Sequence, residues 1–151
     1  MEVVTATARD IDLLIEFRFY YLYSQGDISD TEREQIEKQL REYFAEHLGR
    51  DCECFLLKKD GEYISSVYMI KLDRPAGTTF PNGKTAFLMN VFTKPEYRKT
   101  GAASVLLDFV IEYAKSCKIS AIDLSSTKMG RSLYLRKGFC LRGNSEMRMS
   151  L

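Results

Sequence analysis

The chain has 151 residues with 22 basic and 21 acidic side chains, and its net charge of +1 excludes the strong positive field of a general nucleic-acid binder. Hydrophobic residues make up 45% and charged residues 28%, which excludes a disordered tail protein and a coiled coil. No apolar run approaches the roughly 20 residues that cross a bilayer, and no secretion signal is visible. We therefore expect one cytoplasmic domain, residues 1–151, without nucleic-acid or membrane partners.

Changes in hydrophobic period divide the chain into helices and strands. In chain order they are strand 2–7, helix 8–24, helix 30–48, strands 52–58 and 62–71, loop 74–84, strand 85–93, helix 102–117, strand 120–124, helix 129–137, and strands 139–141 and 145–149. Thr31 and Glu34 have capping-box spacing, and Gly49 is placed to end that second helix. The pair Asp60-Gly61 predicts a hairpin.

This order, β-α-α-β-β-β-α-β-α-β-β, predicts a single α/β domain with a mixed sheet. Residues 85–93 are mostly apolar, so we expect a central strand there.

The single histidine, His47, and four cysteines argue against a zinc site. Cys52 and Cys54 are two apart and would face the same side of a strand, but they lack metal-ligand spacing and a second pair. With Cys117 and Cys140 they are expected to be structural thiols. A cysteine nucleophile with a histidine base remains open, although no other feature supports it.

The segment 90–104 predicts a strand end, a turn and a helix start. Such a turn presents unpaired backbone N–H groups and the positive end of a helix dipole, which together suit a pyrophosphate. Gly101 lets phosphates approach, Arg98 and Lys99 add charge, and Ser104 adds a hydroxyl. The turn is neither a Walker A loop, which needs Gly-Lys-Ser/Thr, nor a dinucleotide fingerprint, which needs two more glycines.

Two patterns together resemble the GCN5-related N-acetyltransferase superfamily. The first resembles its acyl-CoA pyrophosphate loop and is matched by Pro95, Arg98, Gly101 and Ala103. The second resembles its Leu-Tyr-x-x-x-Gly-Phe element and is matched by Leu133, Tyr134, Gly138 and Phe139. The strand and helix order is also similar to that fold, so the resemblance implies a mixed, mostly antiparallel central sheet.

The resemblance assigns roles to residues near both patterns. Those it places on acetyl-CoA are Val91, Phe92 and Thr93 along the pantetheine arm, and Arg98, Lys99, Thr100, Gly101, Ala102, Ala103 and Ser104 around the pyrophosphate. Tyr134 would be the general acid at the CoA sulfur, either by hydrogen-bonding the thiolate or with a pKa lowered by nearby positive charge. Thr127 stands where the family often has Asn, with a shorter side chain that lacks the amide fork. Gly130, where Ala is frequent, is interpreted as a site of close approach, and no metal is implied.

The base that would deprotonate the acceptor is left unassigned among His47, Glu96, Asp123 and a water relay. We expect the acceptor end to be built from the two N-terminal helices and loop 74–84. Arg18, on the first of these helices, would either bind an acid group or form a salt bridge at the helix edge, and the salt bridge is the expected outcome.

The resemblance therefore implies an acyl-CoA-dependent N-acetyltransferase that acts on a small-molecule or peptide amine. A non-catalytic acyl-CoA sensor or regulatory protein of the same fold is the first alternative. A scaffold that never meets CoA is the second. Similar proteins often form dimers, which leaves a homodimer open, although no sequence patch indicates one.

Overall fold

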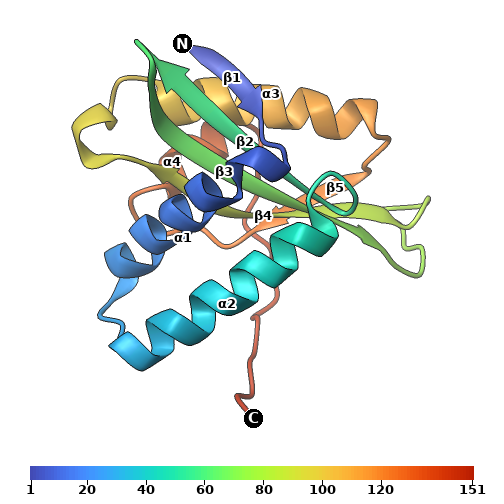
Figure 1. Ribbon diagram of the computed structural model, residues 1–151. Helices are drawn as coiled ribbons and strands as arrows, with labels where there is room; N and C mark the ends of the chain where they lie inside the picture. Colours follow the sequence, from blue (N-terminus) through green and yellow to red (C-terminus); the bar gives the residue numbers. More distant parts are fainter.

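A single five-stranded sheet organises the computed structural model, which describes residues 1–151 (Figure 1). Its strands lie in chain order and are β1 (Glu2–Thr5), β2 (Cys52–Lys59), β3 (Glu62–Asp73), β4 (Lys84–Thr93) and β5 (Ala121–Leu124). The first three pairings are antiparallel and the β4–β5 pairing is parallel. The mixed, mostly antiparallel α/β sheet is thereby confirmed, with β4 as an internal strand between β3 and β5.

Helices cover both faces of this sheet (Figure 1). They are α1 (Ile11–Gln25), α2 (Asp30–His47), α3 (Ala102–Ser116) and α4 (Arg131–Arg136). The apolar side chains of α1 and α2 pack with Leu56, Tyr68 and Phe92 in one core. Those of α3 pack in a second core that includes Phe55 and Tyr134. The strands supply side chains to both cores because successive residues point to opposite faces.

Local signals place several element ends. Asp60 and Gly61 both adopt positive φ, 49° and 86°, as a tight hairpin between β2 and β3 requires. The capping box of α2 is formed by Ser29 and Glu32, so the expected Thr31–Glu34 pair was wrong by two residues. The first helical region is a 3₁₀ turn, Ala8–Asp10, that continues into α1.

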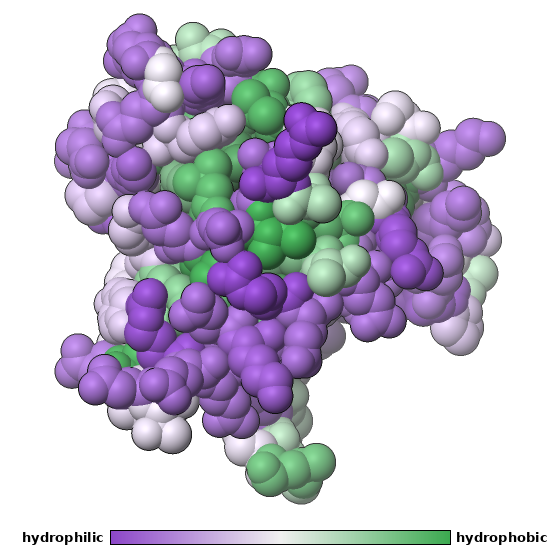
Figure 2. Space-filling model, viewed as in Figure 1, coloured by the Kyte–Doolittle hydropathy of each residue, from purple (hydrophilic) through white to green (hydrophobic).

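The two expected closing strands, 139–141 and 145–149, do not form. The intervening Gly143 and Asn144 disfavour strand structure, and the apolar runs on either side are short. Side chains in this tail are mostly solvated, and the chain ends in an apolar tip that projects from the body (Figures 1 and 2). The outer edge of β5 consequently has no partner strand and borders a cleft of about 720 Å³.

None of the helices is at once long enough and apolar enough to cross a bilayer.

Candidate active site

β4 continues beyond the point where its neighbour β5 ends. The last pair of the parallel ladder is Leu88 with Leu124, whereas β4 runs on to Thr93. Residues 89–93 therefore have no strand partner on the β5 side. Because polar groups alternate in direction along a strand, and Lys94 N–H donates to Ile64 on β3, those of Val91 and Thr93 face the open side.

Phe92 was predicted to lie along the pantetheine arm together with Val91 and Thr93, but its environment is different. Its carbonyl oxygen accepts a hydrogen bond from Ser65 Oγ at 2.7 Å, so its backbone faces β3. Its ring is buried against Phe17 and Tyr20 of α1. Phe92 thus anchors the strand end under α1, and the open side of β4 presents the backbone groups of Val91 and Thr93.

A bulge at Asn90 begins this free stretch of β4. Asn90 has a positive φ of 53°, and the β3–β4 register shifts between Ser66 and Tyr68 opposite it. The buried Asn90 amide donates to Phe17 O at 3.2 Å and to Ser66 Oγ at 3.1 Å, and accepts from Arg18 at 3.3 Å. Sequence reasoning gave Asn90 no role. The available signal was that Asn tolerates the left-handed conformation better than most residues.

The turn before α3 exposes a run of backbone donors. Lys99 and Gly101 have positive φ, 63° and 88°, and α3 begins at Ala102. The first helical bond runs from Val105 N–H to Gly101 O at 3.0 Å, and no turn or cap hydrogen bond uses the N–H groups of residues 99–104. Thr100 Oγ1 donates to Tyr97 O at 2.7 Å, and this hydrogen bond stabilises the turn. N–H groups without an intrahelical partner at a helix start can bind an anion.

Side chains around this turn differ in what they offer a ligand. Ala102 is buried in the α3 core, whereas Ala103 and Ser104 are half-buried at the helix start. Lys99 is exposed. Arg98 turns back onto β4, where its Nε donates to Thr93 O at 3.1 Å. The charge of Arg98 therefore lies between the turn and the end of β4.

Tyr134 lies on α4 with its ring buried and its hydroxyl open to solvent without a hydrogen-bond partner. The ring meets Phe139 edge-on, with centroids 5.8 Å apart. A Cβ at Gly130 would lie 3.1 Å from Tyr134 Cε2, which shows that Gly130 is a point of close approach. The Thr127 hydroxyl accepts the Gly130 N–H at 3.2 Å and thus serves the start of α4.

Burial, with a smaller contribution from the Tyr21 phenol, raises the pKa of Tyr134 to about 12. Of the two alternatives for Tyr134, the one in which nearby positive charge lowers its pKa is contradicted, because no cation offsets the loss of solvent around the ring. Tyr134 is thus a neutral proton donor over the whole physiological range.

None of the three candidate bases contacts Tyr134, although Asp123 lines the same cleft. His47 Nδ1 contacts Asp51 Oδ1 at 2.8 Å, and its ring stacks on Tyr43 at the end of α2. Asp123 pairs with Arg74 at 3.4 Å and with Arg142 at 3.8 Å. Glu96 lies in the exposed 3₁₀ turn after β4. None of the three is hydrogen-bonded to Tyr134, so the structure identifies no base.

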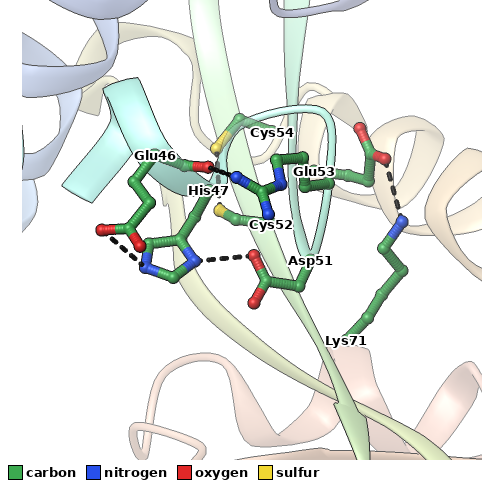
Figure 3. Close-up of polar contacts among 8 residues, drawn as sticks. Glu46, His47, Asp51, Cys52, Glu53, Cys54 and Lys71 are labelled. Carbon is green, nitrogen blue, oxygen red and sulfur yellow. Dashed lines mark hydrogen bonds and ion pairs between the residues drawn. The ribbon is translucent and has the colours of Figure 1, made fainter.

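Cys52 and Cys54 point to the same side of β2, with sulfur atoms 3.8 Å apart (Figure 3). Both are fully buried, and the neighbouring His47 and Asp51 are engaged with each other rather than with sulfur. No group of three or more histidine, cysteine or acidic residues converges as a metal site would require. The pair fills the core between α2 and β2.

Arg18 does not form the expected salt bridge at the helix edge. Its Nη1 donates to Asn90 Oδ1, and its guanidinium carbon lies 5.5 Å from the centroid of the Tyr21 ring. Arg18 thereby reaches from α1 to the bulge where β4 leaves β5.

The acetyltransferase (GNAT) family model matches residues 16–139 of this chain. The chain belongs to the GNAT acetyltransferase family. A predicted acetyltransferase from Clostridium acetobutylicum, solved with acetyl-CoA, is 26% identical, with a TM-score of 0.87 over 98% of this chain and 95% of that one. Among proteins with curated descriptions, no sequence matches this chain.

Two further solved structures show the same fold at lower identity. A GCN5-related N-acetyltransferase from Ralstonia eutropha is 17% identical, with a TM-score of 0.83 over 98% of this chain and 97% of that one. A ribosomal-protein-alanine N-acetyltransferase from Brucella melitensis is 16% identical, with a TM-score of 0.73 over the whole of both chains.

Features of this GNAT chain fit acetyl-CoA at two separate places. The unused N–H groups of residues 99–104 suit a diphosphate, because anions bind where a helix begins. The open side of β4 at Val91 and Thr93 offers backbone groups to an extended, amide-containing arm, much as an edge strand does. The turn follows directly after β4, so one elongated ligand can reach both.

Proposed function

We propose that this GNAT chain transfers an acetyl group from acetyl-CoA to a primary amine of a small molecule or peptide, by direct attack while both substrates are bound. The observation that carries the proposal is the open stretch of β4 leading directly into the turn with unused N–H groups. Any helix start leaves N–H groups unpaired, so the argument against a scaffold is that here they adjoin a strand stretch that also lacks a partner.

Acetyl-CoA would supply the acetyl group as a thioester. The amine nitrogen forms a bond to the acetyl carbon, the carbon–sulfur bond breaks, and the sulfur leaves with the bonding electron pair. N–H groups on the open side of β4 would stabilise negative charge on the carbonyl oxygen. Binding both substrates in line would supply much of the remaining rate enhancement.

Tyr134 would stabilise the departing sulfur through its hydroxyl hydrogen. Full proton transfer from a phenol of pKa about 12 to a thiolate of ordinary pKa, about 8.5, is uphill by roughly 5 kcal/mol. Tyr134 therefore acts first as a hydrogen-bond donor to sulfur. Water then donates the proton that converts the thiolate to the thiol. Water also accepts the proton that the amine loses, because no candidate base is hydrogen-bonded to Tyr134.

Two measurements test this function. Calorimetric titration with acetyl-CoA should show one site, and thiol release with a library of amines, amino acids and peptides should identify an acceptor. Binding without turnover of any acceptor would favour an acyl-CoA sensor of the same fold. Absence of binding would exclude both functions and leave a scaffold.

A further inference from the structure

Arg18 is a half-buried cation without an anionic partner. None of the contacts between basic and acidic side chains in the structure includes Arg18. Its contacts are a 3.3 Å hydrogen bond to the Asn90 side chain and the face of the Tyr21 ring. Both partners are neutral, so they hold the guanidinium in place without neutralising it. A partly desolvated charge of this kind is costly unless it acquires a partner.

The guanidinium has donors to spare. It carries five N–H groups in a fixed plane, and only one of them reaches a protein acceptor. Burial lowers the pKa of Arg18, which nevertheless stays cationic at neutral pH. A planar, charged fork with unused donors matches the two oxygen atoms of a carboxylate.

Arg18 lies where an acceptor for the proposed reaction would bind. Asn90, its hydrogen-bond partner, is the bulge from which β4 runs free of β5. Tyr21, its ring partner, lies one turn further along α1 and is close enough to Tyr134 to influence it electrostatically. Arg18 and Tyr134 are thus both close to Tyr21, with α1 supplying the side of the sheet opposite the α3 layer.

We propose that Arg18 binds a carboxylate of the acceptor, so that the acceptor is a small amine bearing a carboxylate, such as an α-amino acid. This inference rests on the proposed acetyl transfer. Asn90 fixes the guanidinium at one end and the Tyr21 ring supports its face, which leaves the outer edge of the fork for the ligand.

Pairs of α-amino acids and their primary amides, matched in side chain, provide the test. For each pair kcat/KM is measured by thiol release, and the acid-to-amide ratio in Arg18→Gln is divided by that in the wild type. This double ratio cancels the different basicity of the two amines. We expect it to fall by about 10- to 100-fold, the contribution of hydrogen bonds to a charged group. Acetyl-CoA affinity should stay unchanged.

Two further variants complete the design. Arg33→Gln is the matched control, because Arg33 lies over the Phe19 ring at 4.0 Å and donates to Tyr23 but is on α2, away from the bulge. It should keep the wild-type ratio. Arg18→Lys retains the charge without the fork and should fall between wild type and Arg18→Gln, with circular dichroism verifying that each variant is folded.

An unchanged double ratio in Arg18→Gln overturns the inference even when acetylation is observed. If no pair is turned over, calorimetry with the amino acids on the CoA-bound protein decides, and the absence of binding by any of them likewise overturns it. Failure of the proposed function itself has a different signature, because acetyl-CoA would then either not bind or bind without thiol release by any amine of the wider library.

Discussion

Tyr134 shows how a single residue's surroundings set its chemistry. Its ring is enclosed by Gly130 and Phe139, while its hydroxyl opens to solvent without a partner in the protein. Buried tyrosines ordinarily find a hydrogen-bond partner for that group. The unpaired hydroxyl and the raised pKa together favour the interpretation that Tyr134 is a neutral hydrogen-bond donor to a ligand. They disfavour the interpretation that Tyr134 only packs against its neighbours.

Replacing Tyr134 by Phe should lower kcat by about 10²- to 10⁴-fold, the usual contribution of positioned proton donors, with acetyl-CoA affinity kept. The variant loses only the hydroxyl, so the fold should persist. Because the pKa of Tyr134 is raised to about 12, the wild-type hydroxyl stays protonated as pH rises. The pH profile of kcat should therefore show no loss attributable to Tyr134 below about pH 10. A kcat for Tyr134→Phe within twofold of wild type would rule out the role.

Gly130→Ala tests whether the position of the Tyr134 ring matters. The new Cβ would lie 3.1 Å from the ring and 3.4 Å from Thr127 Oγ1, and Gly130 has an ordinary φ of −82°, so the main strain is against Tyr134. We expect kcat to fall by up to about tenfold, since small misplacements of catalytic groups are costly. Gly143→Ala is the control, because its Cβ would meet no atom within 4 Å. Equal kcat values for the two variants would contradict this interpretation.

At the scale of elements, the turn between β4 and α3 brings together unused backbone donors. Two left-handed residues, Lys99 and Gly101, reverse the chain tightly enough that successive N–H groups gather before the helix starts. At Gly101 a side chain would meet no atom within 4 Å, so space around it is free and its φ alone favours glycine.

Gly101→Glu should abolish acetyl-CoA binding while the fold is retained. The substitution adds a carboxylate among the N–H groups and about 1–2 kcal/mol of left-handed strain. Gly49→Glu controls for the strain, because Gly49 also has a positive φ, 79°, in open space, but at the end of α2. Calorimetry on both variants, with circular dichroism, separates the two effects. If Gly101→Glu binds acetyl-CoA as tightly as Gly49→Glu does, residues 99–104 are not the phosphate site.

At the scale of the whole molecule, Asn90 joins the helical layer to the sheet. Its side chain bonds to Phe17 and Arg18 on α1 and to Ser66 on β3, from a bulge in β4. The Tyr68 hydroxyl adds a second link by donating to Leu14 O. These polar links hold α1 over the open stretch of β4, so the same contacts that stabilise the fold also shape the site.

Asn90→Ala should lower the free energy of unfolding by about 2–4 kcal/mol, because two buried hydrogen bonds and one partly buried one, of about 1 kcal/mol each, are lost and Ala tolerates positive φ less well. Urea denaturation measures this change. Asn144→Ala, in the exposed C-terminal segment, is the control and should stay within about 0.5 kcal/mol of wild type. A loss no larger than that of the control would show that Asn90 does not join the layers.

The sequence by itself determined the order of the elements up to α4, the hairpin at Asp60-Gly61 and the glycine turn before α3. These depend on local properties, namely hydrophobic period and the backbone freedom of glycine. The closing strands were predicted wrongly because strand pairing depends on burial against a partner. Short apolar runs such as 139–141 do not indicate whether such a partner is present.

Only the tertiary structure decided how distant residues meet. It brought Arg18 and Asn90, 72 positions apart, into contact and showed that Arg18 lacks the salt bridge expected of it. It turned the Phe92 backbone toward β3 and raised rather than lowered the pKa of Tyr134. Each of these outcomes follows from desolvation and side-chain partners supplied by other elements, which periodicity and motif spacing do not encode.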